Sequence, residues 1–240
     1  MDKIIMVSKD FKKISLGIAG INKLLGGGIP ENSVVLVSGG AGCGKTTFLC
    51  QYINEGLKRG ETCLFVSLEE SKEQIKQDAI QFGWDFDKYE KKDKLYLKQY
   101  NPFEVSSNIG LNSFERYIEY IKAKRVVIDP ITLFAEFITN EGVDDKRGEY
   151  AIRRGIFNVI SILKKLNVTA VLSGEIIEGS KYKLSKYGEE EFVVDGVIVL
   201  TTMDGVGKRT LCIKKMRSIK HDFTPKNFKI TDKGIVVETE

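Results

Sequence analysis

A glycine-rich stretch of eight residues constrains this chain more than any other feature. Residues 39–46 read Gly-Gly-Ala-Gly-Cys-Gly-Lys-Thr and fit the pattern G-x-x-x-x-G-K-[ST]. An apolar run at 33–38 precedes them, and a helical pattern from Lys45 to about Lys58 follows. A strand before and a helix after are the context that distinguishes this pattern from a chance glycine turn. The sequence therefore predicts a strand, a phosphate-binding loop and a helix in succession.

The residue types in this loop suit a bound phosphate. Glycines allow backbone N–H groups to turn inward around an anion. The helix that begins near Lys45 presents unpaired N–H groups and the positive end of its dipole to the same anion. Lys45 adds a mobile positive charge, and the Thr46 hydroxyl can bind Mg²⁺. We therefore predict that ATP contacts the following residues: Gly39, Gly40, Ala41, Gly42, Cys43, Gly44, Lys45, Thr46 and Thr47.

Acidic residues follow two other apolar strands. Asp129 ends the strand predicted over 125–128, which would place its carboxylate at the C-terminal edge of the sheet and predicts a second Mg²⁺ ligand. Glu69 and Glu70 follow another strand and could orient and deprotonate an attacking water. The alternative is that this pair lies in the first turn of a helix capped by Ser71, where the helix dipole favours acidic side chains. Spacing alone leaves both interpretations open.

Short β-branched apolar runs alternate with amphipathic helical patterns along the whole chain, without a linker or an internal repeat. This order predicts one α/β domain over residues 1–240 with a mainly parallel sheet. Further strands are expected at 62–67, 94–97, 169–172 and 196–200, and further helices at 71–82, 111–123 and about 150–166. The last forty residues have the pattern of β-hairpins at an edge of the sheet.

Composition argues against several classes of protein. The net charge is only +4, and basic residues are interleaved with acids, which does not indicate a dedicated nucleic-acid binder. No stretch approaches the roughly 18 uncharged apolar residues of a membrane span. The N-terminus has no pattern of a secretory signal, so we expect a cytoplasmic protein. The four cysteines have no metal-binding spacing and should be reduced and mostly buried, with Cys43 in the loop as the exception.

Several motifs, in order, resemble the KaiC-type proteins, a branch of the RecA-like ATPases. The resemblance covers about residues 15–237 and implies a RecA-like core, a P-loop nucleotide site and a Mg²⁺-dependent ATPase in which Glu69 and Glu70 are catalytic. Besides the phosphate loop, the motifs are an N-terminal segment at 17–30, Phe65–Glu70, Phe82–Asp85, the segment 187–197, and Lys215-Met216-Arg217 followed by His221.

The last of these motifs implies a homo-oligomer. In KaiC-type hexamers ATP lies between subunits, and the Lys and Arg of a K-x-R motif reach the γ-phosphate of the neighbour. By resemblance Lys215 and Arg217 would do so here, and His221 would lie near the nucleotide. Positive charge beside the phosphate oxygens stabilises the charge that develops in the transition state. From the residues alone, an exposed basic edge strand is the simpler interpretation of 214–217.

The chain also departs from the family pattern. Ala19 and Asn22 replace the usual Pro and Asp, and Cys43 replaces Thr or Ser, which changes packing and sensitivity to oxidation. Clock proteins of this type carry two such domains, whereas one is expected here. Glu191 and Phe192 stand where the kinase-competent domain has a Ser-Thr pair. We therefore expect ATP hydrolysis without autophosphorylation at this segment.

Two other functions stay open. Recombination ATPases related to RecA and RadB share this core and bind DNA, and loops after Asp129 and Leu172 would then face nucleic acid. The segment 178–187 interleaves Lys with Tyr, which suits phosphate contact and base stacking. Acidic residues at 189–191 and in a loop at 139–148 would repel a DNA backbone. The third possibility is a module that binds ATP tightly, scarcely hydrolyses it and recruits an unknown protein partner.

Overall fold

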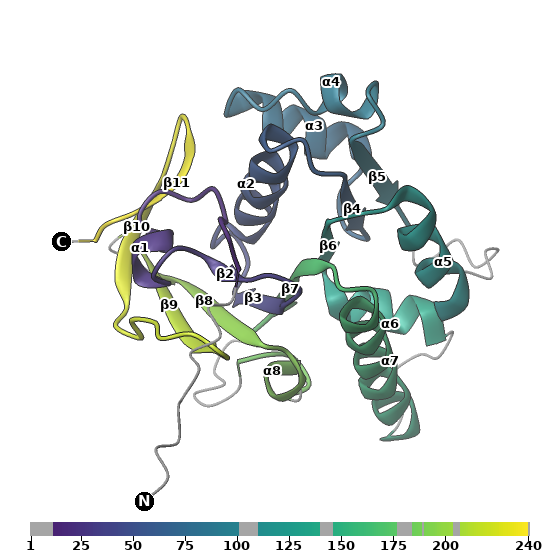
Figure 1. Cartoon of the computed structure of the whole chain (residues 1–240). Coiled ribbons are helices and arrows are strands. Elements are labelled where there is room, and N and C mark those ends of the chain that lie inside the picture. Colours follow the sequence, from purple (N-terminus) through teal and green to yellow (C-terminus); the bar gives the residue numbers. More distant parts are fainter. Residues whose placement is uncertain are drawn as a thin grey trace, which may run out of the picture.

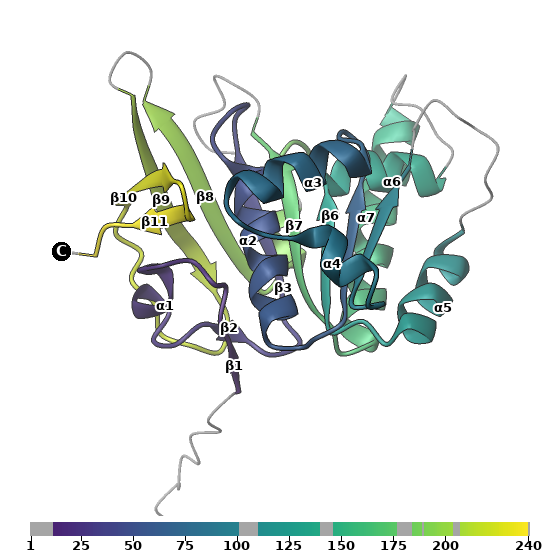
Figure 2. The ribbon, with the colours of Figure 1, turned by 90° about the horizontal axis from the view of Figure 1, so that it is seen from above.

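The central feature of the computed structural model is a twisted sheet with helices on both faces (Figures 1 and 2). The described residues are 12–100, 110–139, 146–176, 184–188, 190–203 and 207–239. Within them the sheet has the strand order β11-β10-β9-β8-β3-β7-β6-β4-β5. Its strands are β3 (Val34–Gly39), β4 (Cys63–Ser67), β5 (Leu95–Gln99), β6 (Arg125–Asp129), β7 (Thr169–Glu175), β8 (Gly196–Met203), β9 (Lys208–Met216), β10 (Lys226–Thr231) and β11 (Gly234–Val237).

The sheet is parallel from β8 to β5 and antiparallel from β8 to β11. The residues of β3 are buried throughout, as are those of β4 and β6, because helices cover both faces of this part. A separate two-stranded sheet pairs β1 (Lys13–Ile14) with β2 (Ile29–Pro30). The expected α/β class, with a mainly parallel sheet and a hairpin edge at the C-terminus, is confirmed.

Helices pack against each face of the sheet around separate apolar clusters (Figure 2). The first cluster includes residues of α1 (Ile21–Leu24), α2 (Lys45–Lys58), α3 (Lys72–Gln81) and α4 (Phe86–Glu90). The second includes residues of α5 (Leu111–Ile121), α6 (Ile131–Thr139) and α7 (Lys146–Lys165). The short helix α8 (Glu190–Val193) leads into β8. None of the helices in the described ranges is long and apolar enough to cross a membrane.

The segment after β6 differs from the sequence-based expectation. Under the alternative DNA-binding hypothesis a loop after Asp129 would face nucleic acid, but α6 begins at Ile131. Its residues Ile131, Phe134 and Ala135 are fully buried, because positions three and four apart form one apolar face. The acid-rich loop expected at 139–148 instead includes the end of α6 and the start of α7, and residues 140–145 lie outside the described ranges.

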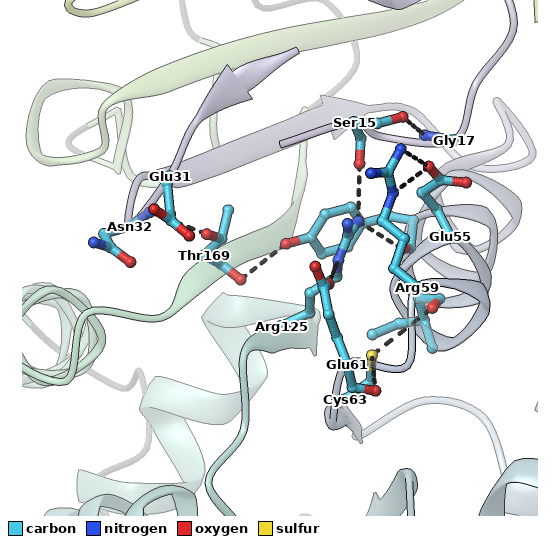
Figure 3. A network of polar contacts seen from close by, with 12 residues as sticks. Ser15, Gly17, Glu31, Asn32, Glu55, Arg59, Glu61, Cys63, Arg125 and Thr169 are labelled. Carbon is cyan, nitrogen blue, oxygen red and sulfur yellow. Dashed lines mark hydrogen bonds and ion pairs between the residues drawn. The ribbon is translucent and has the colours of Figure 1, made fainter. Parts of the chain in front are cut away.

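A network of polar contacts surrounds Arg125, the first residue of β6 (Figure 3). Arg125 is only 1% exposed and forms an ion pair with Glu61. Its Nη1 donates to the backbone oxygens of Ser15, at 2.9 Å, and Tyr52, at 3.1 Å, and its guanidinium lies 4.7 Å from the centre of the Tyr52 ring. One side chain therefore joins β6 to α2, the segment before β4 and the N-terminal segment.

We expect an Arg125→Met variant to lose about 3–5 kcal/mol of unfolding free energy, because the Glu61 carboxylate and two backbone oxygens lose their donors. Urea unfolding followed by circular dichroism measures this difference. The control is Arg59→Met, which removes the exposed ion pair between Arg59 and Glu55 and should cost less than about 1 kcal/mol. Equal effects of the two substitutions would contradict the structural role given to Arg125.

Candidate active site

The phosphate loop, residues 39–46, connects the end of β3 to the start of α2, as expected. Gly42 and Gly44 have φ angles of 67° and 101°, which glycine adopts without steric cost. A Cβ atom added to Gly40 or Gly42 would meet no atom of the described residues within 4 Å, so the loop is open to them at these positions. This combination of backbone curvature and free space fits the phosphate groups of a nucleotide.

The phosphate loop forms one wall of a cavity of about 700 Å³, which we call the phosphate cavity. This volume lies within the usual range for small-molecule sites. Lys45, Thr46 and Thr47 line the phosphate cavity from α2, Glu69 and Glu70 from the segment after β4, and Glu175 from the end of β7. The structure therefore gathers the predicted loop and the predicted acidic pair around one space.

Thr46 and Asp129, predicted to bind Mg²⁺, lie side by side. The Thr46 hydroxyl donates to Asp129 Oδ2 at 3.2 Å, and the Ser173 hydroxyl donates to Asp129 Oδ1. Asp129 is only 3% exposed, and this burial raises the pKa of its carboxyl. A hydroxyl beside a carboxylate fits Mg²⁺, which takes oxygen ligands and keeps several of its own waters.

The acidic pair precedes α3 and does not belong to it. Ser71 is the cap, since its Oγ accepts a hydrogen bond from Gln74 N at 3.1 Å, and α3 begins at Lys72. The Ser67 hydroxyl accepts from the Glu70 backbone N at 3.0 Å and donates to the Glu70 backbone O at 2.8 Å, which holds the turn. The alternative that Glu69 and Glu70 fill the first helical turn is therefore wrong.

Electrostatics distinguish the two glutamates. Burial, reinforced by Asp129, Asp78 and Glu69, raises the pKa of Glu70 to about 7. Its Oε2 is buried and has no hydrogen-bond partner among the described residues. Burial and Asp129 also raise the pKa of Glu69. A carboxyl that titrates near neutral pH suits a general base, which favours Glu70 for this role.

Lys45 and Cys43 are two further residues of the phosphate loop with reactive side chains. Lys45 Nζ donates to the backbone oxygens of Gly39, at 3.0 Å, and Gly40, at 2.9 Å. Cys43 was expected to differ from the other cysteines, but it is 1% exposed and burial raises the pKa of its thiol. All four cysteines are buried and free. Cys43 therefore packs beneath the loop as a small apolar residue.

The C-terminal motif lies apart from the phosphate cavity of its own chain. Lys215 Nζ donates to the backbone oxygens of Glu191, at 2.8 Å, and Val194, at 2.7 Å. Arg217 Nη2 donates to the backbone oxygen of Phe192 at 3.0 Å. Both cations thus hold the C-terminal end of α8, where helix carbonyls lack partners. His221, in the segment between β9 and β10, also does not line the phosphate cavity.

Sequence reasoning missed several residues of the site. Ser173 and Glu175 lie in β7, which runs beyond the expected end at Leu172 and pairs Glu175 with Gly39 of β3. The argument that found Asp129, a polar residue at the C-terminal end of a parallel strand, would also have found Glu175. Lys186 lines the phosphate cavity and appeared only within a segment considered for DNA.

Tyr187 does not suit the base stacking that the alternative DNA-binding hypothesis drew from the segment 178–187. Its side chain is only 6% exposed, and its hydroxyl donates to Glu136 Oε1 at 2.9 Å. A base can stack only on an accessible aromatic face. Residues 178–183 of that segment, which include Tyr182, lie outside the described ranges.

A mostly parallel sheet flanked by helices, with a glycine loop between β3 and α2 and an antiparallel edge, defines the RecA-like class of fold. The chain belongs to the KaiC ATPase family, because the family model described as "ATPase: KaiC" matches residues 14–240. The family resemblance stated from the motifs is therefore confirmed.

Individual relatives agree with this assignment. The UPF0273 protein PH0284 of Pyrococcus horikoshii is 34% identical over 94% of both chains. The circadian clock oscillator protein KaiC of Prochlorococcus marinus is 35% identical over 96% of this chain and 47% of its own length, so this chain spans about half of it. The crystal structure of the KaiC-like protein PH0186 of Pyrococcus horikoshii has a TM-score of 0.80 and 36% identity, covering 95% of this chain and 99% of that one.

Proposed function

We propose that this protein is a cytoplasmic, Mg²⁺-dependent ATPase that assembles with copies of itself into a ring of six and acts as a nucleotide-dependent switch or assembly factor. The observation that carries the proposal is the phosphate cavity. It brings a phosphate loop with Lys45, the adjacent Thr46 and Asp129, and an acidic pair with a raised pKa to one place. These groups match the parts that hydrolysis of a nucleoside triphosphate requires.

In the proposed reaction, a water attacks the γ-phosphorus of ATP in line with the departing ADP. The new O–P bond forms as the bond between the γ-phosphorus and the ADP oxygen breaks, and Glu70 accepts the proton of the water. Lys45 contacts the phosphate oxygens, and backbone N–H groups of the phosphate loop orient them. Thr46 and Asp129 would hold Mg²⁺, which neutralises developing charge on the phosphates.

The position of the C-terminal motif supports a site that two subunits complete. Lys215 and Arg217 lie at the end of α8, apart from the phosphate cavity of their own chain. Arg217 is 51% exposed, which leaves its guanidinium accessible to another subunit. We propose that both cations contact the γ-phosphate bound by the neighbour, and that His221 lies near the same nucleotide.

The deciding experiment is steady-state hydrolysis of Mg-ATP, with and without single-stranded DNA at low salt. We expect slow, continuous turnover that DNA does not change and that a Lys45→Ala variant loses. With ³²P-labelled ATP, we expect no label on the protein, because Glu191 and Phe192 replace the Ser-Thr pair. Stimulation by DNA would support a recombination ATPase instead, and a single burst without turnover would support a module that only binds ATP.

A further inference from the structure

Lys186 lines the phosphate cavity from a short segment that follows β7. The residues on both sides of Lys186 are buried, with Ser185 1% and Tyr187 6% exposed. Both are held by the buried Glu190, which accepts from Ser185 Oγ at 2.6 Å and from the Tyr187 backbone N at 3.3 Å. The backbone at Lys186 is therefore anchored on both sides, and Lys186, whose side chain is 32% exposed, is one of the residues that line the phosphate cavity.

The described residues that line the phosphate cavity include more acidic than basic side chains. The described residues that line it carry two ammonium groups, those of Lys45 and Lys186, against four carboxylates: Glu69, Glu70, Asp78 and Glu175. A triphosphate adds further negative charge, and its binding requires positive groups close to the phosphate oxygens. Lys186 is the lining cation that the phosphate loop itself does not provide.

The present partners of Lys186 are easily exchanged. Its Nζ lies 3.6 Å from Glu136 Oε1, a long ion pair between partly exposed groups, and 5.6 Å from the centre of the Tyr187 ring. Such pairs contribute little because solvent screens them. Glu136 Oε1 also accepts from the Tyr187 hydroxyl at 2.9 Å, so the Glu136 carboxylate keeps a donor when Lys186 turns away.

We propose that Lys186 is a nucleotide-binding residue that exchanges the Glu136 carboxylate for the phosphate oxygens of the ATP bound in its own chain. The inference rests on the proposed function, because it names a further ligand of the same nucleotide. Lys186 would approach the phosphates from β7 and its following segment, whereas Lys45 approaches from α2.

The test is the dissociation constant of the non-hydrolysable analogue Mg-AMP-PNP, measured by calorimetry for the wild type and a Lys186→Met variant. We expect binding to weaken about tenfold in Lys186→Met and to be retained in Lys186→Arg. The matched control is Lys165→Met, which also removes one lysine from an ion pair, with Glu115, on an exposed surface. It should bind within about twofold of the wild type.

A Glu136→Gln substitution tests the exchange itself. Glutamine still accepts a hydrogen bond from the Tyr187 hydroxyl but carries no charge to attract Lys186. Binding of Mg-AMP-PNP should therefore tighten about twofold to threefold when Glu136→Gln is made in the wild type. It should stay unchanged when the same substitution is made in Lys186→Met. If the lost negative charge acted only through the general electrostatic field, binding of Mg-AMP-PNP would tighten in both backgrounds. Equal affinities of Lys186→Met and the wild type, with binding lost in Lys45→Ala, would overturn the inference and leave the proposed function intact. No binding by the wild type would overturn both.

Discussion

An Arg217→Ala variant is expected to hydrolyse Mg-ATP about a thousandfold more slowly than the wild type, because an arginine supplied to the transferring phosphoryl group contributes this much or more. Nucleotide affinity should change far less, since the phosphate loop of each chain stays intact. The Arg217 guanidinium donates to the Phe192 backbone oxygen at 3.0 Å and lies 3.7 Å from Asp195 Oδ1, and its side chain is 51% exposed. Steady-state phosphate release measures the rate.

Mixing variants shows whether Arg217 acts on the neighbour's nucleotide. Neither Arg217→Ala nor Glu70→Gln alone should hydrolyse ATP well. In mixed rings, an intact Arg217 from one variant faces an intact Glu70 from the other at about one quarter of the interfaces, and activity should return in proportion. Lys214→Ala, which removes an exposed neighbouring cation of β9, is the control and should keep full activity. Absence of rescue on mixing would exclude a role in trans.

A Glu70→Gln variant is expected to lose at least about a hundredfold in the rate of hydrolysis, because the attacking water loses its general base. In the wild type, kcat/KM should rise with pH and level off above the Glu70 pKa of about 7. This inflection should disappear in Glu70→Gln and persist in a Glu69→Gln variant. If neither substitution slows hydrolysis tenfold, about 1.4 kcal/mol of barrier, the acidic pair is not catalytic.

The same raised pKa has a consequence for stability. The Glu70 carboxyl binds its proton more tightly in the folded chain, with a pKa of about 7 against the ordinary 4.5. Its contribution to folding is therefore favourable at low pH and is lost as pH rises from about 4.5 to about 7. Glu70→Gln should be more stable than the wild type by about 1 kcal/mol at pH 8, after allowance for partial exposure, and equally stable at pH 4. Urea unfolding at both values checks this.

The local parts of the site could be predicted because their residues are adjacent in the chain. The apolar run 33–38, the glycines and the helix from Lys45 are consecutive, and β3, the loop and α2 occupy these positions. Gly44 has a left-handed φ angle, and a glycine at such a position suits it because glycine adopts this conformation without steric cost. Asp129 was found for a similar reason, because a polar residue at the end of an apolar strand marks the edge of a parallel sheet.

The errors came from packing that residue type does not determine. The DNA-binding alternative placed a loop after Asp129, but Ile131 and Phe134 bury a helix face against α5 and α7. Cys43 was judged by its place in an exposed motif, whereas its side chain turns beneath the loop. Tyr187 was judged by the lysines near it, whereas Glu136 holds its hydroxyl inside the fold. For α6 and for Tyr187, contacts with residues distant in the chain decided the outcome.

The sequence by itself determined the class of this protein and the phosphate loop, because both depend on neighbouring residues and on the alternation of strands and helices. Only the tertiary structure decided which side chains share the phosphate cavity. Glu70, Glu175 and Lys186 meet there because β7 lies between β3 and β6 and β4 follows β6, an order that spacing along the chain does not encode. The raised pKa of Glu70 has the same origin, since burial and the carboxylates of other elements produce it.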